Sequence, residues 1–193
     1  MGRVIDSKNP DYKTGDLTFG LVGWQTHCLT KPSVEDRFRV IPDLLPMPTM
    51  LNVMGSTGIT AYYGLVELGK PKSGETVLVS GAAGATGSVV VQIAKLKGSQ
   101  VIGIAGGTKK CNWLTEEANF DAAIDYKSAN LAETLRELCP NGIDLVFDNV
   151  GGEFLDTALT LINMNARIVL CGAISTYNNE SPAPGPSNYM SLV

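Results

Sequence analysis

A glycine-rich loop is the segment of this sequence whose residue types point most directly to chemistry. It runs from Gly81 to Gly87 and reads Gly-Ala-Ala-Gly-Ala-Thr-Gly. An apolar run typical of a buried parallel strand, residues 76–80, precedes it, and residues 88–97 repeat apolar side chains at helical spacing. In that context glycines let the backbone approach a pyrophosphate, and the helix N-terminus attracts its charge. The loop therefore predicts dinucleotide binding, although Ala82 stands where the first Gly of G-x-G-x-x-G would be.

The end of the second expected strand indicates which dinucleotide binds. This strand covers residues 100–104 and is followed by Ala-Gly-Gly-Thr-Lys-Lys. NAD sites usually carry an Asp or Glu here that binds the ribose 2′-hydroxyl. No carboxylate follows this strand, and Lys109 and Lys110 stand where a helix begins, a place that disfavours cations but would suit a 2′-phosphate. We therefore predict NADP(H) rather than NAD(H).

Strands and helices alternate beyond the loop. This alternation predicts an α/β fold, a Rossmann-type doubly wound parallel sheet. Glycines after the fourth and fifth strands, at 151–152 and 172, leave room for a flat nicotinamide ring. Further strands are expected at 122–125, 144–148 and 167–171, and helices are marked by Cys111, Leu114 and Ala118, by Leu131, Leu135 and Leu138, and by Leu155, Leu159 and Ile162.

The first fifty residues have a different character. They are irregular, with short apolar pieces at 17–19 and 24–29 that we interpret as strands, and Pro42, Pro46 and Pro48 indicate a linker. Ser56 is expected to cap a helix that continues to residue 68. Its predicted apolar face consists of Ile59, Tyr62, Tyr63 and Val66.

Composition narrows the range of partners and ligands. The net charge of -4 argues against nucleic acid or a membrane surface as a partner, because both require a basic face. The sequence lacks an apolar run of 18 residues, and we expect a cytoplasmic protein with reduced thiols. A metal site is not expected, because the potential ligands are scattered: His27, Cys28, Cys111, Cys139 and Cys171.

Two runs carry a family resemblance. Residues 83–98 (Ala-Gly-Ala-Thr-Gly-Ser-Val-Val-Val-Gln-Ile-Ala-Lys-Leu-Lys-Gly) and 171–177 (Cys-Gly-Ala-Ile-Ser-Thr-Tyr) resemble the zinc-free branch of the medium-chain dehydrogenase/reductase superfamily that contains prostaglandin reductases and plant alkenal double-bond reductases. The resemblance implies that residues 1–50 are the tail end of a GroES-like substrate domain with its linker. It also implies that residues 51–193 are a Rossmann dinucleotide-binding domain truncated before its last strand, and that full-length relatives are homodimers.

The resemblance also implies a reaction. NADPH would give a hydride to the β-carbon of an α,β-unsaturated aldehyde or ketone, and the α-carbon would then be protonated. Tyr177 would be the catalytic donor to the developing enolate oxygen, or else would bond the nicotinamide ribose. The implied cofactor residues are Gly84, Ala85, Thr86 and Gly87 at the pyrophosphate, Gly107 and Lys110 at the 2′-phosphate, Tyr126 at the adenosine, and Asn149, Cys171, Gly172, Ala173, Ile174, Ser175, Thr176 and Tyr177 at the nicotinamide.

Two other functions stay open. One is an NADPH quinone reductase of the crystallin-like branch, which has similar glycine loops. The other is a catalytically incomplete chain that binds NADPH without turnover, which the expected absence of both ends of the family pattern favours. The run at 171–177 favours the alkenal reductase.

Overall fold

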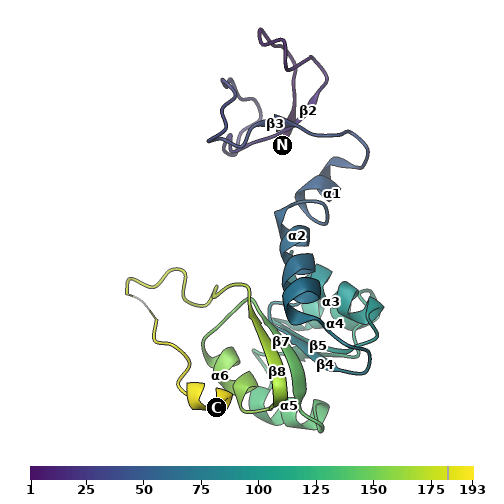
Figure 1. Cartoon of the computed structure of the whole chain (residues 1–193), viewed down its shortest axis with the longest axis vertical. Helices are drawn as coiled ribbons and strands as arrows, with labels where there is room; N and C mark the ends of the chain where they lie inside the picture. Colours follow the sequence, from purple (N-terminus) through teal and green to yellow (C-terminus); the bar gives the residue numbers. More distant parts are fainter. Residues whose placement is uncertain (182) are drawn as a thin grey trace. The chain divides into compact units, whose positions relative to one another are not determined.

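The computed structural model describes residues 1–181 and 183–193 and divides the chain into two compact units, Met1–Gly55 and Ser56–Val193 (Figure 1). The first unit contains a small antiparallel sheet in the order β1-β2-β3. Its strands are β1 (Gly2–Arg3), β2 (Leu17–Phe19) and β3 (Arg39–Val40). Leu17 is buried at the centre of this sheet, as expected for the middle strand.

Two expectations for the first unit were wrong. Residues 24–29 form no strand, and Trp24 and Leu29 are fully exposed, so their apolar side chains have no sheet face to pack on. The proline-rich segment also holds a short helix, α1 (Met47–Leu51). Pro48 lies in the first turn of α1, where a missing N–H costs no helical hydrogen bond.

The second unit is built on a five-stranded parallel sheet, which confirms the Rossmann-type fold. In its order, β6-β5-β4-β7-β8, the strand that comes first in the sequence, β4, is central. Strands β5 and β6 lie on one side of β4, and β7 and β8 lie on the other side, so the strand order reverses between β4 and β7. All four strand pairs are parallel. The strands are β4 (Thr76–Val79), β5 (Gln100–Ala105), β6 (Ala122–Asp125), β7 (Ile143–Asp148) and β8 (Ile162–Leu170).

Helices cover both faces of this sheet (Figure 1). One buried cluster joins the sheet to α2 (Ser56–Tyr62), η1 (Tyr63–Gly69), α3 (Gly87–Leu96) and α4 (Thr108–Glu116). A second cluster joins the opposite face to α5 (Leu131–Leu138) and α6 (Glu153–Leu159). Because both faces are covered, every residue of β4 and all residues of β5 after Gln100 are buried.

The apolar face predicted for the helix after Ser56 was wrong. Ile59, Tyr62 and Tyr63 are all more than half exposed. The segment packs instead through Leu65 and small residues: a Cβ on Gly64 would lie 2.9 Å from the Phe147 ring. Its second part, η1, is a π-helix, so the 3.6-residue period used for the prediction does not hold there.

The last helix and strand also differ from their predicted bounds. Ile162 was assigned to a helix, but α6 ends at Leu159 and Ile162 is the first residue of β8. The strand therefore begins five residues before the expected Arg167 and ends at Leu170. Ile162 pairs with Ile143, which explains why an apolar side chain recurs there at a spacing that resembled a helix.

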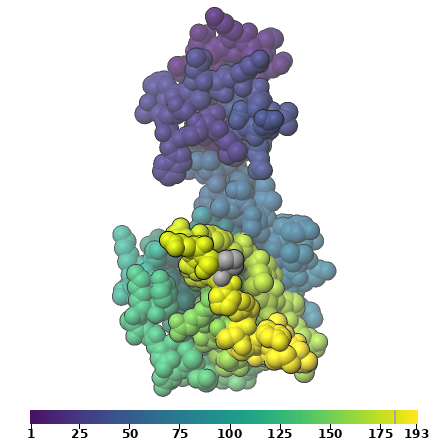
Figure 2. Space-filling model, turned by 90° about the vertical axis from the view of Figure 1, so that its left-hand side faces the viewer, coloured from purple at the N-terminus to yellow at the C-terminus, as the bar shows by residue number. Residues whose placement is uncertain are grey.

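The C-terminal residues, yellow in Figure 2, are part of the second unit. Both the backbone N–H and the hydroxyl of Ser187 donate to the Asp156 carboxylate on α6, and the Asn188 amide donates to the Asp156 carbonyl. A single 3-10 turn, η2 (Tyr189–Leu192), follows. Within residues 1–181 and 183–193, no helix has the length and apolar character needed to cross a membrane.

Candidate functional site at the carboxyl edge of the sheet

The glycine loop lies at the carboxyl end of β4, beside the point where the strand order reverses. Ligands of open α/β sheets bind at this kind of position. Gly81 has a positive φ of 57°, and the Ala82 N–H donates to the Ile104 carbonyl of β5 at 3.0 Å. The loop is therefore fixed to the sheet on the β5 side while its exposed part, Gly84 and Ala85, faces outward.

Gly87 allows helix α3 to start directly on this loop. It is buried, and a Cβ there would lie 2.8 Å from the Ala82 Cα and 2.9 Å from the Gly81 carbonyl carbon. Thr86 precedes the helix, and no side chain caps its N-terminus. The N–H groups of Ser88, Val89 and Val90 donate to the Gly84 and Thr86 carbonyls. What the start of α3 offers to an anion is therefore the positive end of the helix dipole.

A buried carboxylate organises the reversal point between β4 and β7. Asp148 is completely buried and accepts the Ser80 hydroxyl at 2.6 Å, together with the Val150 and Gly151 N–H groups. The Ser80 hydroxyl in turn accepts the Asn149 N–H at 2.8 Å. The Asn149 side-chain amide donates to the Ser80 carbonyl at 2.7 Å, so its orientation is set by the end of β4.

The run from residue 171 to 177 folds back onto this corner. The Cys171 and Gly172 N–H groups donate to the Asp148 carbonyl, and Ile174 N–H donates to the Asn149 carbonyl. Both the hydroxyl and the N–H of Ser175 donate to the Val150 carbonyl. The expected nicotinamide-side residues are therefore brought together, next to the glycine loop.

Tyr177 is fixed within this turn. The Ala173 N–H donates to its phenolic oxygen at 3.1 Å, and a Cβ on Gly172 would lie 2.8 Å from the same oxygen. Thr176 steadies the turn, because its hydroxyl donates to the Ala173 carbonyl at 2.9 Å. The Tyr177 side chain is 65% exposed. Its oxygen accepts from the backbone, so its own proton remains available to an acceptor outside.

The ends of β5 and β6 meet at the other side of the glycine loop. The Asp125 carboxylate accepts the Gly107 N–H at 2.8 Å and the Lys127 N–H at 3.1 Å. These hydrogen bonds, the one from Gly107 first, lower the pKa of Asp125 below its ordinary value. A Cβ on Gly106 would lie 2.8 Å from the Tyr126 ring, so Tyr126 lies against the turn that leads to Lys110.

The helices that start at this edge differ in how their N-termini are satisfied. Helix α5 has Asn130 as a side-chain cap and Glu133 in its first turn, and α6 carries Glu153 and Asp156 there. Helices α3 and α4 have neither a side-chain cap nor an acidic residue in the first turn, and the first turn of α4 contains Lys109 and Lys110. The positive ends of α3 and α4 are thus suited to negatively charged groups.

The three cysteines that are not exposed hold protonated thiols. Burial raises the pKa of Cys171, and the nearby charge of Asp148 adds to the effect. Burial and Asp125 likewise raise the pKa of Cys111, and burial raises that of Cys139 to about 11. None of them is activated as a nucleophile. Among the described residues, no group of three His, Cys, Asp or Glu side chains could hold a metal ion.

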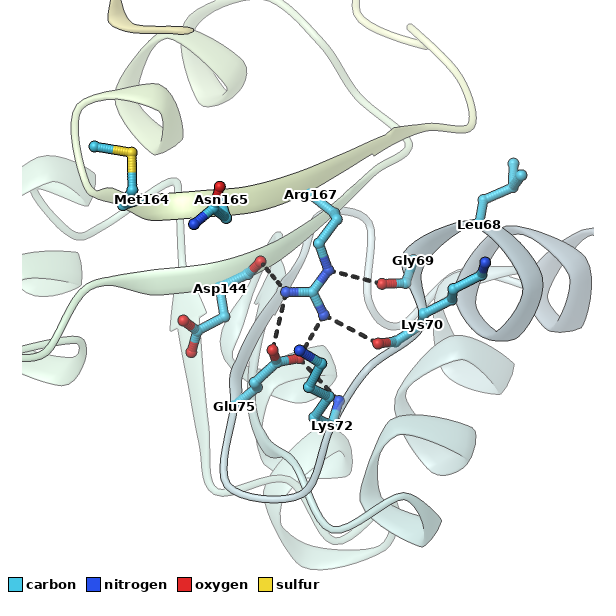
Figure 3. A pocket seen from close by; sticks show the side chains of 9 residues that line it. All are labelled: Leu68, Gly69, Lys70, Lys72, Glu75, Asp144, Met164, Asn165 and Arg167. Atoms are coloured by element: carbon cyan, nitrogen blue, oxygen red, sulfur yellow. Dashed lines mark hydrogen bonds and ion pairs between the residues drawn. The ribbon is translucent and has the colours of Figure 1, made fainter. Parts of the chain in front are cut away.

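A cavity of about 420 Å³ lies at the opposite edge of the sheet, where the strands begin (Figure 3). Arg167 fills its centre and donates to the Gly69, Lys70 and Asp144 carbonyls and to both carboxylate oxygens of Glu75. Every donor of the guanidinium is therefore used within the protein. We interpret this cluster as structural rather than as a ligand site.

Three residues of the carboxyl edge were not found from sequence as parts of the site. Ser80 and Asp148 act through hydrogen bonds between strands that lie 68 residues apart, and Asp125 contacts a turn 18 residues before it. The Asp148-Asn149 pair at a strand end is a weak signal of this role. Neither spacing nor periodicity relates Asp125 to Gly107, because their contact depends on β5 and β6 being neighbours.

The fold and this edge define a Rossmann-type α/β domain with an open glycine loop at its reversal point. Residues 85–190 match the family model described as "Zinc-binding dehydrogenase". The chain therefore belongs to this family, which confirms the resemblance to medium-chain dehydrogenases and reductases. The description mentions zinc, but the residues that the structure describes offer no ligand set for it.

Individual relatives agree with this assignment. The chain is 47% identical over 190 residues to prostaglandin reductase 1 of Bos taurus, which covers 97% of this chain and 57% of the relative. It is 42% identical over 186 residues to the NADPH-dependent curcumin reductase of Escherichia coli, covering 96% and 53%. The structure of CurA in complex with NADPH from Vibrio vulnificus superposes with a TM-score of 0.85 at 42% identity, covering 98% and 56%. The chain thus spans about half the length of the curated relatives it matches.

Proposed function

We propose that this chain is an NADP(H)-dependent oxidoreductase, and more narrowly a reductase of the C=C bond of α,β-unsaturated aldehydes and ketones. The observation that carries the proposal is the carboxyl edge itself, where a glycine loop, two uncapped helix N-termini and the turn at 171–177 lie side by side. Relatives whose names include prostaglandin reductase and NADPH-dependent curcumin reductase support the same reaction class.

The residues present fit a dinucleotide phosphate. Gly84, Ala85, Thr86 and Gly87 would hold the pyrophosphate, since Gly84 and Ala85 are exposed and α3 starts there without a side-chain cap. Gly107 and Lys110 would hold the 2′-phosphate, with Tyr126 along the adenosine. Asn149 and residues 171–177 would line the nicotinamide. A bound reduced nicotinamide would supply a hydride, which no amino-acid side chain can do.

The role proposed for this chain's own residues is to position and polarise the substrate. The Tyr177 hydroxyl would donate to the carbonyl oxygen of the substrate, where negative charge develops as the enolate forms. Asn149 would orient the ring side of the site, because Ser80 and the backbone fix its amide. The proton that the α-carbon finally receives would come from solvent.

The direct test is oxidation of NADPH by the purified chain, followed at 340 nm with 2-nonenal and, separately, with a quinone. Turnover with the alkenal and a saturated aldehyde as product would support the proposal. Faster turnover with the quinone would favour a crystallin-like quinone reductase. NADPH binding without turnover of either would show a cofactor-binding chain and overturn both enzyme proposals, so binding is measured in parallel by cofactor fluorescence.

A further inference from the structure

The side chain of Lys127 lies across the turn that ends β5. Its Cε is 3.1 Å from the position that a Cβ on Gly106 would occupy, and the Tyr126 ring packs on the same position at 2.8 Å. Gly106 is the first residue after β5, where Rossmann domains bind the adenosine ribose. Lys127 thus extends from the turn after β6 to the turn between β5 and α4, the helix whose first turn contains Lys110.

The backbone of Lys127 is fixed at this position. One carboxylate oxygen of Asp125 accepts both the Lys127 N–H at 3.1 Å and the Gly107 N–H at 2.8 Å, which holds the turns after β5 and β6 together. Because that oxygen already accepts two backbone donors, it is committed to the protein. Asp125 therefore serves as a clamp for the two turns and leaves the lysine side chain to face the ligand.

The Lys127 ammonium group is available to a ligand. Across residues 1–181 and 183–193 it donates no hydrogen bond and forms no ion pair, and the same is true of the Lys109 and Lys110 side chains. The Lys127 charge lies close enough to Asp125, the last residue of β6, to help lower the pKa of that carboxyl group. A cation that forms no hydrogen bond and whose stem is packed on a turn is preorganised for an anion, since part of its side-chain entropy is already lost.

We propose that Lys127 is a second cation for the 2′-phosphate and that, together with Lys110, it sets the preference for NADPH over NADH. This inference rests on the proposed function, because it concerns the same cofactor site. It differs from the sequence prediction, which assigned the 2′-phosphate to Lys110 and Gly107. The alternative is that Asp125 binds the hydroxyls of the adenosine ribose, in which case the site would prefer NADH over NADPH.

The test measures dissociation constants of NADPH and NADH for the full chain and for Lys127→Ala, by cofactor fluorescence and by calorimetry. We expect Lys127→Ala to weaken NADPH binding about tenfold and NADH binding less than twofold, because one charge-assisted contact to phosphate is lost. Lys127→Arg should retain most of the affinity. Lys110→Ala is the reference for the contact proposed above, and Lys97→Ala is the matched control at the end of α3.

The outcomes separate the inference from the proposed function. If the parent chain binds NADPH no better than NADH, the proposed cofactor is wrong and the inference falls with it. If the parent prefers NADPH and Lys110→Ala abolishes that preference but Lys127→Ala does not, the inference alone is overturned. Equal losses for both cofactors in Lys127→Ala would also overturn it. Titration with 2′-AMP and 5′-AMP repeats the comparison without the nicotinamide half: Lys127→Ala should weaken only 2′-AMP.

Discussion

Tyr177 combines an exposed ring with a hydroxyl oxygen that the backbone holds in place. The Ala173 N–H donates to this oxygen, so the remaining hydrogen-bonding capacity of the hydroxyl includes its proton. A tyrosine held in this way loses little entropy when it donates to a substrate. Replacing Tyr177 therefore tests whether its hydroxyl donates to the substrate or binds the nicotinamide ribose.

Tyr177→Phe is expected to lower turnover of an alkenal roughly tenfold to a hundredfold, because the developing enolate loses one hydrogen-bond donor. The dissociation constant of NADPH should change less than about twofold. Steady-state kinetics at saturating NADPH, with cofactor fluorescence in parallel, measures both. Tyr189→Phe, which changes an exposed tyrosine in η2, is the matched control. Weaker NADPH binding with unchanged turnover would assign Tyr177 to the nicotinamide ribose instead.

Single residues could be predicted from sequence where their role is local. The glycine loop and Lys110 follow directly from a strand and the helix after it, because a parallel strand always delivers its next residues to the same edge. Asp125, Lys127 and the Ser80 hydroxyl could not be predicted. Their contacts join the ends of different strands, and the local periodicity of a sequence does not show which strands are neighbours in the sheet.

At the scale of elements, the junction of the glycine loop with α3 is the most constrained part of the site. Gly87→Ala would place a methyl group 2.8 Å from the Ala82 Cα, against backbone that cannot move without releasing β4. We expect a loss of roughly 1–3 kcal/mol in the free energy of unfolding. NADPH binding should weaken as well, because the loop must shift.

Urea unfolding and cofactor fluorescence measure these two effects. Gly185→Ala is the matched control, since a Cβ there meets nothing within 4 Å. A stable Gly87→Ala variant with parental NADPH affinity would show that the loop is not the cofactor cradle proposed here. The same pair of variants also separates a local collision from any general effect of replacing glycine.

Elements were predicted best where an apolar run in the sequence corresponds to one buried strand. Strands β4 to β7 have short apolar runs between turns and lie within one residue of their predicted bounds. The apolar face of the helix that starts at Ser56 was mispredicted because its buried residues are Gly58, Ala61, Gly64, Leu65 and Gly69, four of them small. The start of β8 failed because Ile162 continues the spacing of α6 while pairing with β7.

At the scale of the whole molecule, the Arg167–Glu75 pair connects the end of η1 and the starts of β4 and β7 to the interior of β8. Both side chains are more than two-thirds buried. Burial would raise the pKa of Glu75, but the hydrogen bonds from Arg167 and Lys72, with the charge of Arg167, bring it below its ordinary 4.5. The carboxylate therefore stabilises the folded chain above that pH, and this contribution is lost as the pH falls through the lower folded-state pKa.

Replacing Glu75 by Gln should lower the free energy of unfolding by roughly 2–3 kcal/mol at pH 7, because the Arg167 guanidinium loses its charged partner. The difference between parent and variant should shrink below pH 4.5, where the parent carboxylate becomes protonated. Urea denaturation at pH 7 and at successively lower pH measures it. A difference that stays constant down to pH 3 would contradict the role given to this ion pair.

The strand order has a consequence for how the second unit is made on the ribosome. Strands β4, β5 and β6 lie side by side and are complete once residue 125 has been synthesised, but the other edge of β4 pairs with β7, which ends at Asp148. During synthesis of those 23 residues, one edge of β4 has no neighbouring strand. The face of the sheet that later packs on α5 and α6 is also uncovered. Nascent chains of this length are thus the stage at which chaperones would protect the polypeptide from aggregation.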